Sequence, residues 1–176
     1  RMARETVRFI KADGDPFEPV RHAIHATHDR FEYGMTHAFA AAPDWLALRD
    51  STNDPGQRLI ALVEPISHMA WDTRRAPRYA FTTAKRTWDA GAFLATIEGE
   101  REDDAVALLR GALASGLTFA DLRPTVARAA LAHYQDFGHS AIYVHQANRL
   151  IERLGADVTE PVLLALVRSL VTASRE

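Results

Sequence analysis

Residues 17–48 read FEPVRHAIHATHDRFEYGMTHAFAAAPDWLAL, and this stretch shows the pattern that decides the fold class. Its apolar residues Val20, Ile24 and Phe31 recur at intervals of four and seven, which is the spacing of one face of an α-helix. Alternation of apolar and polar residues over the length of a strand is almost absent from the chain. The sequence therefore predicts an all-α protein.

The chain has 176 residues, of which 47% are hydrophobic and 25% charged. This length supports one sizeable core and leaves little room for two. We expect a single helical domain over residues 1–176, in which a first half (1–72) and a second half (100–176) are joined by a connector (73–99).

Composition excludes several classes of function. The 21 Lys and Arg residues nearly cancel the 23 Asp and Glu residues, so no cationic surplus is available for nucleic acid. The absence of cysteine excludes disulfides, thiolate zinc sites and iron–sulfur clusters in this chain. No apolar run approaches the roughly 20 residues of a membrane helix, and residues 1–5 lack the apolar segment of a secretory signal. We expect a soluble, cytoplasmic protein with no membrane partner.

Helix boundaries follow from proline, glycine and capping residues. Pro43 is expected to end the second helix, Pro65 to kink the third, and Thr118 with Asp121 to form a capping box. Gly138 is expected to break or bend the preceding helix, and Gly155 is expected to end the next one. The predicted helices cover about residues 3–12, 17–42, 55–72, 87–97, 105–114, 118–137, 139–154 and 158–174.

An internal repeat appears when the chain is shifted by 102 residues without a gap. The shift superimposes the following pairs: Phe17 and Phe119, Val20 and Leu122, Ile24 and Val126, His37 and His139, Leu48 and Leu150. The helix order also matches. We interpret the pattern as a duplication of about residues 3–72 and 105–174, which predicts a multi-helix bundle with a pseudo-twofold axis.

Two of the eight histidines occupy equivalent positions in the repeat. His139 falls on the apolar stripe of its helix with Ile142 and Tyr143, whereas His145 falls on the opposite face. The pseudo-twofold axis would bring His37 and His139 together in the bundle interior. Both are therefore candidate catalytic residues and candidate metal ligands.

His28 and His68 complete the predicted metal-ligand set, since His28 lies beside an apolar stripe and His68 follows Glu64 by one helical turn. Imidazole together with carboxylate suits iron, manganese or zinc, and helix bundles often build such sites. Weaker candidates of the same kind are His25 with Asp29, Glu32 near His28, and His133 with Asp136.

The sequence leaves alternatives open for these residues. No Glu-x-x-His pair and no His-Glu-x-x-His helix occurs, so the common motifs of metal-binding helices are missing. A bis-histidine haem between His37 and His139 is conceivable. Equally, an inward histidine can be a hydrogen-bonded core residue, and Tyr143 can be a proton donor or a packing residue.

Three segments of the second half carry a family resemblance: HYQDFGHSAIY (133–143), LIERLG (150–155) and VRSLVTASRE (167–176). They resemble the helical region that precedes a Rieske iron–sulfur domain in some bacterial proteins, which is similar to the questin-oxidase-like family. The resemblance implies an oxidoreductase or its companion domain, an oxygenation or oxidative ring-opening reaction, and reduced nicotinamide as the ultimate donor. It carries over His139, with His37 and His68 as further positions.

A Rieske cluster needs two cysteines, so it would have to lie in a partner domain or protein. The leading hypothesis is thus an oxidoreductase domain with a central histidine-lined site for a metal ion or an aromatic substrate, working with a Rieske-type electron donor. Without a metal, the histidines would act as general bases on a phenolic proton.

The alternative is a non-catalytic helical interaction module that docks a redox partner. A DNA-binding regulator using residues 121–137 is disfavoured by the acidic pI of 6.5. The substrate, the metal and the presence of a homo-oligomer are left open.

Overall fold

The computed structural model describes residues 2–133 and 136–174, with the side chain of Asp136 left out, and within these ranges it contains helices and no strands. The all-α prediction is confirmed. No helix in this part of the chain has the length and apolar character to cross a lipid bilayer. The helices are α1 (Met2–Lys11), α2 (Glu18–Thr27), α3 (His37–Asp50), α4 (Pro55–Asp72), α5 (Ala90–Glu98), α6 (Glu102–Ala114), α7 (Phe119–Ala132), α8 (His139–Leu154) and α9 (Thr159–Ala173), with short 3-10 turns at Asp136–Gly138 and Ala156–Val158.

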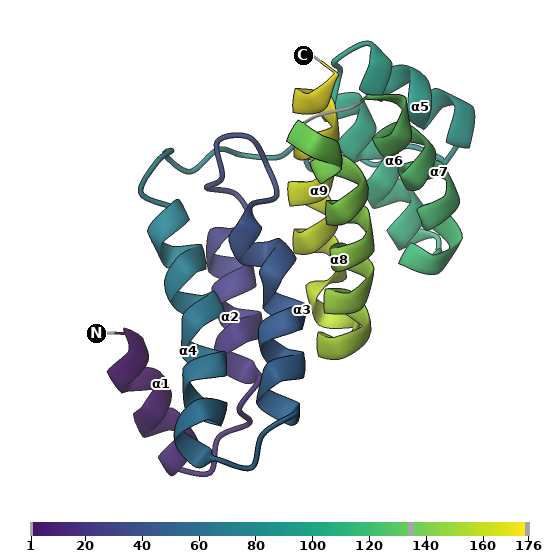
Figure 1. Cartoon of the computed structure of the whole chain (residues 1–176). Coiled ribbons are helices and arrows are strands. Elements are labelled where there is room, and N and C mark those ends of the chain that lie inside the picture. Colours follow the sequence, from purple (N-terminus) through teal and green to yellow (C-terminus); the bar gives the residue numbers. More distant parts are fainter. Residues whose placement is uncertain (1, 134–135, 175–176) are drawn as a thin grey trace.

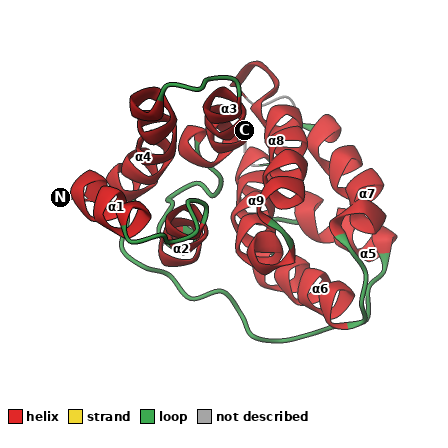
Figure 2. Ribbon diagram, turned by 90° about the horizontal axis from the view of Figure 1, so that it is seen from below, coloured by secondary structure: helices red, strands yellow, loops and turns green. Residues whose placement is uncertain are grey.

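The helices form two groups that meet along α3 and α8 (Figures 1 and 2). One group consists of α1 to α4 and the other of α5 to α9. Residues 73–89 cross from the first group to the second without forming a helix. Figure 1 shows α3 and α8 side by side, and their colours run downward in the same sense. The two helices are therefore parallel.

The core of the second group is built around α9. Its predicted apolar stripe, Val162, Leu166 and Leu170, is buried, and so are Leu163 and Leu164 on its other sides. This helix is covered by α8 and α6, with further contacts to α5, α7 and α2. A helix that is apolar all round is stable in water only when other elements surround it. The second group thus packs around α9.

Side-chain caps fix where several helices begin. The Thr36 hydroxyl accepts a hydrogen bond from the Ala38 N–H at the start of α3, and the Asp54 carboxylate accepts one from the Gln57 N–H at the start of α4. The predicted capping box of Thr118 and Asp121 opens α7. These caps place the first residue of each helix, which determines where His37 lies.

The predicted helix over residues 17–42 is wrong. It breaks after Thr27, and residues 28–36 form a loop that packs on α9, where the Met35 N–H donates to the Ala165 carbonyl at 2.9 Å. Pro43, expected to end a helix, lies inside α3, where it removes one backbone hydrogen bond without ending the helix. The helix predicted to reach Phe137 ends at Ala132, and Tyr134 and Gln135 lie outside the described residues.

The order of the helices agrees with the 102-residue offset. α1 corresponds to α6, α2 to α7, α3 to α8 and α4 to α9, and α3 and α8 both begin at the equivalent histidines. Their packing differs, since α7 packs directly on α8, whereas the equivalent helices α2 and α3 do not pack closely on each other. An ancestral duplication stays a prediction.

Candidate functional site

His37 and His139 lie in direct contact. Their Nε2 atoms are 3.0 Å apart, their ring planes stand at 89° and their ring centroids are separated by 4.9 Å. His37 is the first residue of α3, after the Thr36 cap, and His139 is the first residue of α8, after Gly138 with its positive φ of 88°. Equal starting points on two parallel helices bring the two imidazoles to the same level.

The contact lies at the end of the bundle and not in its interior. His37 is exposed and His139 is half-buried, so the expectation of two imidazoles in a sheltered interior is wrong. Because both residues begin their helices, they lie at the rim where α3 and α8 start, above the buried layer. Ile142, expected on the buried stripe of α8, is 48% exposed.

The histidine pair borders a pocket of about 540 Å³. Tyr143, one turn after His139, is buried, and its ring centroid lies 5.6 Å from that of His139 and 6.2 Å from that of His37. The pocket is also lined by residues of the 28–36 loop, the end of α4 and α9, namely Phe31, Glu32, Tyr33, Gly34, Met35, Thr36, Asp72, Arg75, Ser169 and Thr172.

Charged groups of both signs line this pocket. Glu32 and Asp72 are carboxylates, and Arg75 is a guanidinium. The neighbouring Glu32 carboxylate raises the pKa of Tyr33, because it favours the protonated phenol over the phenolate. Sequence reasoning missed Asp72 and placed Arg75 only within the connector over residues 73–99, since neither belongs to a motif.

The structure does not bring His28 and His68 to the pair, since neither lines the pocket. Nδ1–H of His28 donates to the His25 carbonyl at 2.9 Å, and its ring stacks on Phe81. Burial lowers the pKa of His28. His68 is exposed, with its Nε2 atom 3.5 Å from Glu64, at the predicted spacing. Among the residues described here, no three His, Asp or Glu side chains are grouped to hold a metal ion.

The weaker histidine candidates form separate pairs at the surface. His25 contacts Asp157 at 2.9 Å and not Asp29, which pairs with Arg78. His133 contacts Glu98 at 2.9 Å, while the side chain of Asp136, its predicted partner, lies outside the described residues. These pairs join neighbouring elements. His145 is exposed, as predicted.

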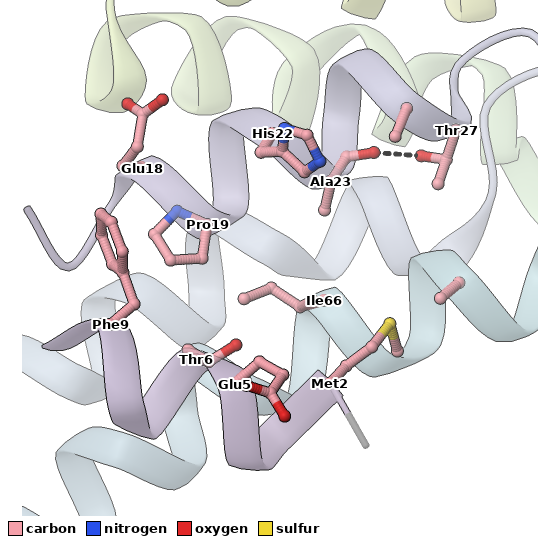
Figure 3. Close-up of a pocket in the computed structure, with 12 residues that line it drawn as sticks. Met2, Glu5, Thr6, Phe9, Glu18, Pro19, His22, Ala23, Thr27 and Ile66 are labelled. Carbon is pink, nitrogen blue, oxygen red and sulfur yellow. Dashed lines mark hydrogen bonds between the residues drawn. The ribbon is translucent and has the colours of Figure 1, made fainter. Parts of the chain in front are cut away.

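A second pocket of about 510 Å³ lies between α1, α2 and α4 (Figure 3). Figure 3 shows Phe9 of α1 facing Pro19 of α2, with Ile66 of α4 beyond them. Its acidic residues have partners nearby, since Glu5 pairs with Arg8 and Glu18 with Arg21. This pocket is mainly apolar and offers no pair of reactive side chains. The pocket at His37 and His139 is therefore the candidate site.

Comparison of this chain with family models, with curated proteins and with solved structures finds no match.

Proposed function

We propose that His37 and His139 hold one octahedral divalent metal ion of the iron or manganese class, and that a small molecule binds in the adjoining pocket. The observation that carries this proposal is the 3.0 Å separation of the two Nε2 atoms. In an octahedral site with metal–nitrogen bonds of about 2.1 Å, neighbouring nitrogens lie about 3.0 Å apart, whereas in a tetrahedral zinc site they lie about 3.4 Å apart. The pair thus has the spacing of two adjacent ligands.

The distance between the two ring centroids shows how the imidazoles are inclined to each other. Imidazoles that point at one ion at right angles would have centroids about 4.6 Å apart, and collinear rings joined by a hydrogen bond would have centroids about 5.3 Å apart. The observed 4.9 Å lies between these values, so the two rings are inclined to each other. A bound ion would supply Lewis-acid chemistry at this point.

The protein's own residues shape the ligand side of the site. Phe31 and Met35 are buried in the pocket wall, and Tyr143 covers the pair from within α8. These groups exclude water from one side of a bound molecule. With only two protein ligands, the ion would keep positions open to solvent and substrate.

The redox form of this proposal is an oxidoreductase domain that receives electrons from a Rieske-type donor. It rests on the resemblance of residues 133–176 to Rieske-associated helical regions. Because this chain has no cysteine, the cluster would belong to a partner domain or protein.

Metal titration tests the histidine pair directly. Co²⁺ is added to the purified, metal-free protein and followed by its visible absorption and by calorimetry. We expect one equivalent to bind, and His37→Ala and His139→Ala each to abolish that binding. His145→Ala is the matched control, since it removes an exposed histidine from α8 and should bind as wild type. Equal binding by all variants, or no binding by wild type, overturns the proposal.

One observation favours the interaction module as a second candidate. Phe137 precedes His139, has a φ of 60° and is 87% exposed, while Leu131 on the preceding helix is 75% exposed. An exposed phenylalanine in a left-handed conformation is costly unless it makes contacts elsewhere. Under this candidate, Phe137→Ser abolishes binding to an isolated Rieske domain, whereas His37→Ala leaves that binding unchanged.

A further inference from the structure

Two charged side chains of opposite sign line the histidine pocket without ion-pair partners. Asp72 is the last residue of α4, and Arg75 lies in the turn that follows. Within the described ranges, neither side chain forms an ion pair, with the other or with a third residue. The neighbouring arginines, in contrast, have partners. The guanidinium carbon of Arg74 lies 4.6 Å from the Trp71 ring centroid, and Arg78 pairs with Asp29.

Asp72 and Arg75 border the pocket from one turn of the backbone. The Arg75 N–H donates to the Asp72 carbonyl at 3.2 Å, so a tight turn connects the residues while both side chains border the pocket. Asp72 also lies at the C-terminus of α4, where the helix dipole disfavours a carboxylate and favours a cation. A positively charged ligand group would relieve that repulsion.

The remaining wall of the pocket defines the rest of the ligand. Phe31, Met35 and Tyr143 offer apolar and aromatic surface. A second carboxylate, Glu32, also lines the pocket, so a compact polyanion such as phosphate would face two carboxylates and one guanidinium. The volume of about 540 Å³ is large enough for an aromatic small molecule.

Resting on the proposed function, we infer that the pocket beside His37 and His139 takes a zwitterion with an aromatic body. Its carboxylate pairs with Arg75 and its ammonium group with Asp72. The chemical class is that of an aromatic α-amino acid. The paired charges select for a ligand that carries both groups, because each group alone would leave one protein charge unpaired.

Three matched probes test this inference on the metal-free protein by calorimetry and by histidine side-chain NMR. They are L-phenylalanine, 3-phenylpropanoate, which lacks the ammonium group, and L-phenylalaninamide, which lacks the carboxylate. We expect L-phenylalanine to bind at least about tenfold more tightly than either analogue, and its binding to shift the His139 resonances.

Neutral variants assign the two charges. Asp72→Asn should remove the preference over 3-phenylpropanoate, and Arg75→Gln should remove the preference over L-phenylalaninamide. Arg74→Gln is the matched control, because Arg74 adjoins Arg75 but does not line the pocket, and it should bind all three probes as wild type does.

The inference is overturned if the wild-type protein binds none of the probes, if it binds the three equally, or if the neutral variants keep the wild-type preferences. Its failure is separate from that of the metal proposal. Selectivity for L-phenylalanine without Co²⁺ binding would leave the inference standing alone, and Co²⁺ binding without selectivity would leave only the metal site.

Discussion

Asp44 on α3 accepts a hydrogen bond from Gln146 on α8 at 2.6 Å, and these residues are 102 positions apart, as are His37 and His139. Each member lies seven residues after the corresponding histidine. Equivalent residues meet every seven positions when two parallel helices pack in register, as in a coiled coil. The register of α3 against α8 therefore sets the histidine contact.

Replacing Asp44 should loosen that register. The Asp44 carboxylate also pairs with Arg149, so Asp44→Ala removes two contacts between α3 and α8. Because these side chains are largely exposed, solvent screening limits the expected loss in the free energy of unfolding to about 0.5–1 kcal/mol. Urea denaturation monitored by circular dichroism measures it. Glu152→Ala, which affects a contact with Asn148 within α8, should cost less, and an equal loss would contradict the assignment.

Gly34→Ala should displace the loop that lines the histidine pocket. Gly34 has a φ of 85°, and a Cβ atom there would lie 2.4 Å from the Ser169 nitrogen of α9. We expect a loss of about 2–4 kcal/mol, because both backbone strain and a collision with α9 oppose the change. Thermal denaturation provides the measurement.

Gly116→Ala is the matched control for Gly34. Its φ of 89° is similar, but a Cβ atom there would meet nothing within 4 Å. Only the cost of the left-handed conformation remains, about 1 kcal/mol. If both alanine variants lose the same stability, the close approach of Gly34 to α9 is not important.

The Phe17 ring should stabilise the packing of α2 with α3 and α8. The guanidinium carbons of Arg49 on α3 and Arg153 on α8 lie 4.9 Å and 4.8 Å from its centroid, at the start of α2. Phe17→Leu keeps apolar bulk but removes both cation–π contacts, for an expected loss of about 1–2 kcal/mol. Phe17→Tyr retains the aromatic face and should stay near wild type in chemical denaturation. A stable leucine variant would contradict this role.

Burial of His28 should make the protein less stable in mild acid. Its pKa in the folded state is lowered from the ordinary 6.5, chiefly by desolvation, so the unfolded chain takes up the proton first. The stability is therefore complete above about pH 6.5 and falls as the pH drops below that value. Denaturation midpoints measured between pH 5 and pH 8 should follow this course.

His28→Asn should flatten that acid dependence. The asparagine side-chain amide can still donate to the His25 carbonyl but cannot take up a proton in this range. His22→Asn, at an exposed position on the same helix, is the control and should keep the wild-type slope. An unchanged slope in His28→Asn would assign the acid sensitivity to another group.

Local sequence rules predicted the helical class and many helix ends, because caps and breakers act within a few residues. Thr118 with Asp121 opens α7 through contacts three positions apart. The break after Thr27 could not be found in this way. Residues 28–36 leave the helical path because Met35 bonds to Ala165 and Gly34 fits against Ser169, and these partners lie at least 130 positions away.

The candidate site was predictable where it depends on helix starts and not where it depends on side-chain direction. Equivalent positions of His37 and His139 in the repeat predicted which imidazoles meet. Their exposure was not predicted. Periodicity shows on which face of a helix a residue lies, but not how close that residue is to the end of the bundle. Asp72 and Arg75 reach the same pocket only through the packing of α4 beside the 28–36 loop.

The central position of α9 determines when this protein can complete its structure during synthesis. The ribosome releases α5 to α8 before the helix around which they pack, so the apolar surfaces that contact α9 stay in water until residues 159–173 emerge. The 28–36 loop waits as well, because its contacts are on α9. We expect nascent chains that stop before α9 to need chaperones, and the histidine pocket to close last.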